Sequence, residues 1–186
     1  LESAGTHHRK PWYGTACCPS QISRFLPSVG NYVYATSSDA LWVNLYIASE
    51  TNVTIEDVPM HVKQLTEYPW KGDVKLVMTP EKETNFTLKV RIPNWCKNYE
   101  FMVNGEKVKT EIDKQYLLVE RTWKAGDEVS FSMAMPVEVV AADPRVKANI
   151  GKRCLQRGPL VYCMEEIDNP LYNNATLLHS TNYIAN

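Results

Sequence analysis

Hydrophobic residues along this chain follow the period of a helix first and the period of strands afterwards. Between residues 19 and 30 the apolar positions recur at three- and four-residue spacing, at Ile22, Phe25, Leu26 and Val29. Pro19 suits the first helical turn, because the N–H that proline lacks needs no partner there, and Gly30 suits the end. Pro27 is awkward inside a helix and is expected to bend it or end it early.

From residue 31 onward, apolar and polar residues alternate. The cleanest stretch is 86–92, where Phe86, Leu88, Val90 and Ile92 alternate with polar residues, as in a half-buried strand. Similar segments follow one another at 41–47, 74–78, 101–103, 116–119 and 129–135. Asn104-Gly105 is a strong hairpin signal. Short strands at this spacing, with no helical segment between them, predict a mainly β chain with antiparallel sheets packed as a β-sandwich, preceded by a short N-terminal helix.

The pattern divides the chain into three expected parts. Residues 1–35 are an irregular stretch and the helix, residues 36–137 are the sandwich, and residues 138–186 are additional strands or the start of a second β-sandwich. Strands are expected at 137–140, 154–156 and 160–164. The polar tail closes on no recognisable element, so we expect the chain to be cut at its C-terminus, and its start at Leu1 predicts that a leader, tag or upstream domain has been removed.

Composition excludes two classes of partner. The chain has 186 residues, 44% of them hydrophobic and 22% charged, and a net charge of −1, which is typical of a globular protein. With this charge and no run of Lys and Arg, we expect no nucleic-acid partner. No stretch of about 18 apolar residues occurs, so we expect no membrane partner.

The main candidate functional residues are Cys17 and Cys18, which lie at or just before the start of the predicted helix. A disulfide between neighbouring residues would strain the backbone. Three interpretations of the pair are left: two soft metal ligands, a reactive thiolate, or small buried residues. A helix N-terminus stabilises a thiolate through its macrodipole. Cys96, Cys154 and Cys163 sit in strand patterns and are interpreted as core residues.

Several motifs in order along the chain resemble a known family. They are residues 12–19 (WYGTACCP), 22–24 (ISR), 40–46 (ALWVNLY), 68–70 (YPW), 91–96 (RIPNWC), 103–105 (VNG) and 156–163 (QRGPLVYC). Together they resemble the late catalytic region and the following domains of glycoside hydrolase family 127, the β-L-arabinofuranosidase-like family. The resemblance covers nearly the whole chain, but only the C-terminal third or so of a family member.

The resemblance implies a fold and a chemistry. The family has an (α/α)6 barrel followed by β-sandwich domains, so residues 1–35 would be the C-terminal end of the barrel. Its proposed reaction is a retaining double displacement by a cysteine held on zinc, with a separate Glu as acid/base. By this resemblance Cys17 is the catalytic nucleophile, and Cys17 and Cys18 are metal ligands. His7 and His8 would either line a sugar subsite or be solvated.

The function expected from the resemblance is that of a C-terminal fragment of a retaining glycoside hydrolase. Its parent would act on an oligosaccharide or glycoside, specifically β-L-arabinofuranosides or related sugars of plant glycans, in a bacterial cytoplasm or periplasm. The acid/base Glu and the Glu-x-Cys zinc ligands would lie upstream of Leu1. We therefore expect zinc in the intact parent, no tight zinc binding by this chain, and no activity of this chain alone. Thr15 and Ser20-Gln21 depart from the family pattern and leave the exact sugar open.

The alternative is a non-catalytic β-sandwich that binds carbohydrate or braces another domain. Its aromatic residues are Trp42, Tyr46, Tyr68, Trp70 and Trp95. Trp42 and Tyr46 are expected on the face opposite Leu41, Val43 and Leu45, where they would pack on the barrel or stack on a sugar. An exposed face of Ile22, Phe25 and Leu26 would need a partner, which predicts self-association as a homo-oligomer.

Overall fold

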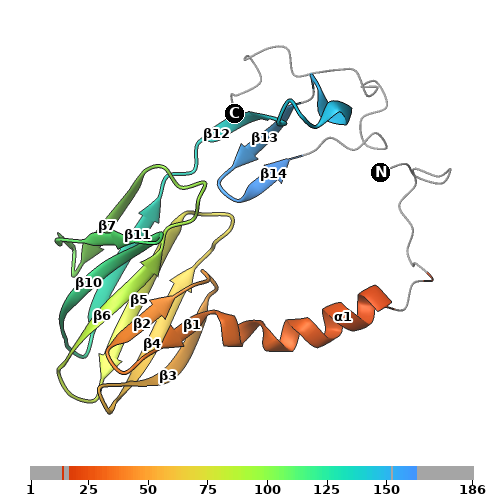
Figure 1. Cartoon of the computed structure of the whole chain (residues 1–186). Helices are drawn as coiled ribbons and strands as arrows, with labels where there is room; N and C mark the ends of the chain where they lie inside the picture. Colours follow the sequence, from red (N-terminus) through yellow and green to blue (C-terminus); the bar gives the residue numbers. More distant parts are fainter. Residues whose placement is uncertain (1–13, 15–16, 152, 163–186) are drawn as a thin grey trace. The chain divides into compact units, whose positions relative to one another are not determined.

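A computed structural model describes residue 14, residues 17–151 and residues 153–162 of the chain (Figure 1). It contains two compact units. The larger spans Pro19–Met135, and the smaller includes the described strands that follow Pro136. No helix in the described ranges has the length and apolar content needed to cross a bilayer.

The predicted helix is present and begins at the cysteine pair. Helix α1 runs from Cys17 to Phe25 and passes directly into the 3₁₀ helix η1, Leu26–Tyr32. The change of helix type falls where Pro27 was expected to interrupt, because proline lacks the N–H for the α-helical bond and disfavours the α conformation of the residue before it. Gly30 does not end the segment as predicted, since η1 continues to Tyr32.

Two sheets form the sandwich in the larger unit, as the alternating pattern predicts. The first has the order β1-β2-β6-β10-β9 and the second the order β3-β4-β5-β11-β7-β8. The strands of the first sheet are β1 Tyr34–Thr36, β2 Ala40–Val43, β6 Thr84–Arg91, β9 Glu111–Asp113 and β10 Tyr116–Trp123. Those of the second are β3 Ser49–Ile55, β4 Val58–Thr66, β5 Asp73–Pro80, β7 Tyr99–Val103, β8 Glu106–Lys107 and β11 Asp127–Met133.

One pairing departs from the antiparallel rule. Strands β2 and β6 run parallel, with Leu41 opposite Leu88, whereas the other pairs within the two sheets are antiparallel. The chain leaves β2 to build β3, β4 and β5 in the second sheet, then returns to the first through β6, as Figure 1 shows. This long crossover allows a parallel neighbour, which a tight hairpin cannot provide.

The core lies between the two sheets and follows the alternation. Leu41, Leu88 and Leu117 of the first sheet are fully buried, as are Leu76 and Val129 of the second. At one end Trp123 stacks on Phe86 with ring centroids 5.5 Å apart, and its indole N–H donates to the Phe86 carbonyl at 3.1 Å. The burial of alternate residues on both sheets confirms the predicted β-sandwich.

The smaller unit contains a three-stranded antiparallel sheet, β12 Val137–Ala141, β13 Arg153–Arg157 and β14 Leu160–Tyr162, with a short 3₁₀ helix η2, Lys147–Asn149. These strands agree with the three predicted after Pro136, and Met164 and Cys163 lie outside the described residues. Val139 and Val161 remain exposed. The predicted boundaries at 35/36 and 137/138, and the start of a second sandwich, stay predictions.

The loops of the sandwich gather at two ends, because the strands of both sheets begin and end together. We call one the turn end, formed by residues 37–39, 56–57, 81–83, 104–105 and 124–126. The other is the connection end, formed by residues 44–48, 67–72, 92–98, 114–115 and 134–135. The incoming chain reaches the connection end, where the Asn44 N–H donates to the Val33 carbonyl at 2.9 Å. The outgoing chain leaves from the same end, where Met133 N–H donates to Gly72 and Ala134 N–H to Asn98.

Candidate functional site

The cysteine pair lies at the first turn of α1, with both side chains exposed. The two Sγ atoms are 3.8 Å apart, so no disulfide joins them. Two thiolates bound to one tetrahedral zinc ion at about 2.3 Å each are separated by about 3.8 Å. The pair therefore fits as two of the sulfur ligands of a zinc site.

The remaining ligands of such a site are not assembled around the pair. Within the part of the chain that the structure describes, no group of three or more His, Cys, Asp or Glu side chains could hold a metal ion. His7 and His8 lie outside the described residues. A closed zinc site needs about four ligands. The roles of Cys17, Cys18, His7 and His8 therefore stay predictions.

The other cysteines differ from the pair in exposure. Cys96 is buried in the core, as predicted, and its thiol donates to the Asn98 carbonyl at 3.5 Å. Burial raises the pKa of the Cys96 thiol, and the hydrogen bond to Asn98 opposes this with a smaller effect. The raised pKa keeps the thiol protonated at neutral pH. Cys154 is partly buried. Among the described cysteines, only Cys17 and Cys18 are exposed. Their exposure favours a role as metal ligands or as a reactive thiolate over a role as core residues.

The five aromatic residues differ in exposure, so they do not form the sugar-stacking platform that was one of the two roles considered for them. Trp42 lies on the face opposite Leu41 and Val43, as expected, with Lys89 Nζ 4.4 Å from its ring centroid. Tyr46 does not share that face, and the expectation is wrong: its side chain is 3% exposed. Strand β2 ends at Val43, so the alternation that placed Tyr46 outward is lost in the loop that follows.

Tyr46 is instead part of an aromatic cluster inside the connection end. Its ring meets Tyr68 edge-on at 5.5 Å between centroids, and Tyr68 stacks on Trp95 at 6.4 Å. The Tyr46 hydroxyl donates to the Arg91 carbonyl, and burial raises the pKa of Tyr46 far above its ordinary value. Trp70, by contrast, is 65% exposed. The rings of Tyr46, Tyr68 and Trp95 stabilise this end of the sandwich, whereas the ring of Trp70 is largely exposed.

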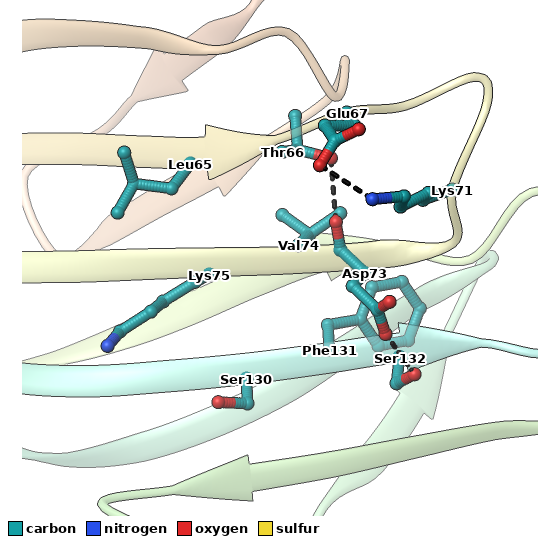
Figure 2. Close-up of a pocket in the computed structure, with 10 residues that line it drawn as sticks. All are labelled: Leu65, Thr66, Glu67, Lys71, Asp73, Val74, Lys75, Ser130, Phe131 and Ser132. Carbon is teal, nitrogen blue, oxygen red and sulfur yellow. Dashed lines mark hydrogen bonds and ion pairs between the residues drawn. The ribbon is translucent and has the colours of Figure 1, made fainter.

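A shallow depression of about 490 Å³ lies beside this end, on the outer surface of β4, β5 and β11 (Figure 2). It is lined by Leu65, Thr66, Glu67, Lys71, Asp73, Val74, Lys75, Ser130, Phe131 and Ser132. In the sequence, only the polar residues at the outward positions of β5 and β11 point to this depression. That β4 lies beside these two strands is determined by the fold and not by the local pattern.

Each charged group that lines the depression has a polar partner. Figure 2 shows Lys71 directed at Glu67, with Nζ 2.8 Å from Oε1, and Ser132 donating to Asp73 at 2.5 Å. The hydrogen bond that Lys71 donates to the Glu67 carboxylate raises the pKa of Lys71. Lys75 pairs with Glu128 at 2.6 Å. The depression therefore presents paired charges rather than a carboxylate or amine poised for acid–base catalysis.

Comparison with known proteins gives consistent matches. The family model "Beta-L-arabinofuranosidase, GH127 middle domain" matches residues 40–135, and "Glycoside hydrolase family 127 C-terminal domain" matches residues 137–185. A non-reducing end β-L-arabinofuranosidase of Bifidobacterium longum subsp. longum is 34% identical over 173 residues, which are 88% of this chain and 25% of the relative.

Solved structures agree with the family models. A β-L-arabinofuranosidase of family GH127 from Geobacillus stearothermophilus T6 is 46% identical and superposes with a TM-score of 0.82, over 89% of this chain and 26% of that one. A GH127 β-arabinofuranosidase at 38% identity superposes with a TM-score of 0.78, over 86% of this chain and 28% of that one. The chain thus spans about a quarter of the length of these relatives.

Proposed function

Because the chain belongs to glycoside hydrolase family 127, we propose that it is part of a retaining glycosidase that hydrolyses β-L-arabinofuranosides, including those of plant glycans. In this proposal the start of α1 supplies the nucleophile and the sandwich supports the rest of the enzyme. The names of the relatives support the substrate class, since each is described as an arabinofuranosidase.

The proposed reaction is a double displacement at the anomeric carbon of the sugar. The Cys17 thiolate attacks this carbon and displaces the aglycone, whose oxygen takes a proton from an acid in the N-terminal portion of the enzyme. Water, deprotonated by the same group, then displaces the Cys17 sulfur and releases the sugar with retained configuration. When bound, zinc would keep the thiolates of Cys17 and Cys18 deprotonated.

One observation carries this proposal. Two exposed thiols begin the helix with their sulfurs 3.8 Å apart, the separation that a shared tetrahedral zinc ion requires. Two ligands do not make a closed site, so in this proposal the chain alone binds zinc weakly and does not turn over substrate. The N-terminal portion of the enzyme would supply the other ligands and the acid/base.

The test compares this chain with the full-length protein, using an aryl β-L-arabinofuranoside. We expect no turnover by this chain and turnover by the full-length protein, abolished by Cys17→Ala and strongly reduced by Cys18→Ala. Cys154→Ala is the matched control, because it removes a partly buried cysteine far along the sequence, and should leave the rate unchanged. Turnover by this chain alone, or full activity of the Cys17→Ala protein, would contradict the proposal.

A second candidate role is that of a non-catalytic brace. The inward packing of Tyr46, Tyr68 and Trp95 disfavours a carbohydrate platform, which needs exposed rings. The exposed Trp70 at the connection end favours contact with another part of the protein. Bracing and catalysis are compatible, because they use different parts of the chain.

A further inference from the structure

The cysteine pair supplies two sulfur ligands from a single turn of helix α1. Cys17 Sγ and Cys18 Sγ are 3.8 Å apart, and both side chains are exposed. Two sulfurs that each lie about 2.3 Å from one tetrahedral ion have this separation. A structural zinc site takes about four such ligands, so the pair fills half of the coordination sphere of one ion.

The other half of the sphere has no source in the described part of one copy. Residues 14, 17–151 and 153–162 bring no group of three or more His, Cys, Asp or Glu side chains together. Cys96 is buried and Cys154 is partly buried, so neither resembles the exposed pair. A zinc ion on the pair therefore keeps positions that a second molecule can fill.

The helix that presents the pair is accessible and carries little charge. In the part of the chain that the structure describes, no residue of α1 or of η1 is buried. Arg24, in the last turn, is the only charged residue of α1. Two such helices can approach at their first turns without burying a charged side chain. A zinc ion bound by four thiolates is anionic, and the positive ends of the two helix dipoles would stabilise it.

The face of α1 that carries Cys18 is also apolar. Cys18, Ile22 and Phe25 follow one another at spacings of four and three residues, so they share one face of the helix. Ile22 and Phe25 are each 58% exposed. Two helices that pack in parallel along this face bury it on both copies and bring the cysteine pairs together at one end. An antiparallel arrangement would separate the cysteine pairs by the length of the helix.

We propose that two copies of this chain bind one zinc ion between them, with Cys17 and Cys18 of each copy as its four ligands. The two α1 helices pack in parallel about a two-fold axis through the metal, so each copy contributes the same residues. Zinc binding by a single copy is weak, and it becomes tight only when the second copy completes the site.

This inference rests on the zinc-binding role of the pair in the proposed function, but it concerns assembly and not hydrolysis. In the proposed function, the N-terminal portion of the full-length protein supplies the remaining ligands. Zinc is then held within one copy and does not promote pairing through α1. A competing source of ligands is His7 and His8, which precede the pair in the sequence and lie outside the described residues. Their use would give one zinc ion per single copy.

The experiment is sedimentation equilibrium of this chain, reduced and freed of metal, with and without zinc chloride. We expect zinc to lower the dissociation constant of the dimer by about a hundredfold, and EDTA to reverse the effect. The dimer should contain about one zinc ion per two copies. Cys17→Ser and Cys18→Ser should each remove the zinc dependence, whereas Cys154→Ser, the matched control, should leave it unchanged. Ile22→Ser should weaken the dimer and keep its zinc content.

Cobalt(II) in place of zinc identifies the ligands. Its visible spectrum distinguishes tetrahedral coordination by four sulfurs from mixed sulfur and nitrogen coordination. We expect the four-sulfur spectrum to reach its full intensity at about one cobalt ion per two copies. In the full-length protein, zinc should leave the dissociation constant of any dimer unchanged.

Three results would overturn the proposal. The first is one zinc ion per single copy, lost in a protein with His7→Ala and His8→Ala, which would place all the ligands in one copy. The second is a dimer of equal stability with and without zinc, which would assign association to the apolar face alone. The third is the absence of zinc binding at any concentration of this chain. The activity of the full-length Cys17→Ala protein tests the proposed function separately, so the two failures are distinguishable.

Discussion

The turn end and the connection end are built from the same strands but from different kinds of loop. At the turn end, loops of two or three residues join the strands, and left-handed residues close them, as at Glu56, Asp57 and Asn104. At the connection end, three loops are five to seven residues long and enclose the cluster of Tyr46, Tyr68 and Trp95. Short polar turns are therefore enough to close the sheets at one end, whereas the longer loops at the other end pack aromatic residues against the core.

The largest expected effect comes from the glycine that closes the connection end. Gly72→Ala would place a Cβ 2.0 Å from the Met133 carbonyl oxygen, and backbone on both sides resists the shift. We expect a loss of about 3 kcal/mol in the free energy of unfolding, measured by urea denaturation of this chain. Gly30→Ala is the control, since no atom lies within 4 Å of the added carbon, and its stability should be nearly unchanged. Equal stability of the two variants would contradict the tight closure of this end.

The second largest effect tests the turn end, where Asp127 joins two turns. Its carboxylate accepts from Asn104 Nδ2 and from the Lys124 N–H, both at 2.8 Å, and is 7% exposed. Asp127→Ala leaves both donors without this acceptor, so we expect a loss of about 2 kcal/mol in urea denaturation. Asp39→Ala, an exposed carboxylate at the same end, should cost well under half as much. If the two substitutions cost the same, the turn end does not depend on Asp127.

A smaller effect tests the aromatic cluster inside the connection end. Tyr46→Phe removes the hydroxyl that donates to the Arg91 carbonyl but keeps the ring packing. We expect a loss of about 1 kcal/mol, the usual value for one buried hydrogen bond. The control is Tyr162→Phe, in which the ring is half exposed. A stable Tyr46→Phe protein would show that packing alone holds the cluster.

The smallest effect concerns the surface pair beside Trp70. The hydrogen bond that Lys71 donates to the Glu67 carboxylate raises the pKa of Lys71 above that of an unfolded lysine. The favourable contribution is therefore fully present below the unfolded pKa and is lost as the pH rises through the folded pKa. Glu67→Gln should lower the Lys71 midpoint in an NMR titration of its Cε resonance, with no change at Lys82. An unchanged midpoint would mean that the ion pair does not persist in solution.

Local patterns predicted the elements of this chain well. The alternation over residues 86–92 predicted β6, Asn104-Gly105 predicted the β7–β8 turn, and the cysteines were placed at the start of a helix. These features depend on neighbours in the sequence, which the pattern contains. The resemblance to family 127 is likewise confirmed, since it rests on motifs spread along the chain.

Features that depend on distant residues could not be predicted. The parallel pairing of β2 with β6 follows from a crossover of three strands, and Tyr46 was misplaced because the end of β2 is set by tertiary packing. The closure at Gly72 depends on Met133, about sixty residues away. Likewise, the depression lined by β4, β5 and β11 exists only once three separate strands are paired. The described residues bring no group of three or more His, Cys, Asp or Glu side chains together, so the metal-binding role of the cysteine pair stays a prediction.

The central claim is that Cys17 is the nucleophile of a family 127 glycosidase, and a trapped glycosyl-enzyme tests it most directly. The full-length protein would be treated with a mechanism-based β-L-arabinofuranosyl inactivator, digested with trypsin and analysed by mass spectrometry. We predict one pentosyl group on the peptide that ends at Arg24, attached to Cys17 and absent from the Cys17→Ala protein. Attachment to a carboxylate elsewhere, with Cys17 unmodified, would contradict the account.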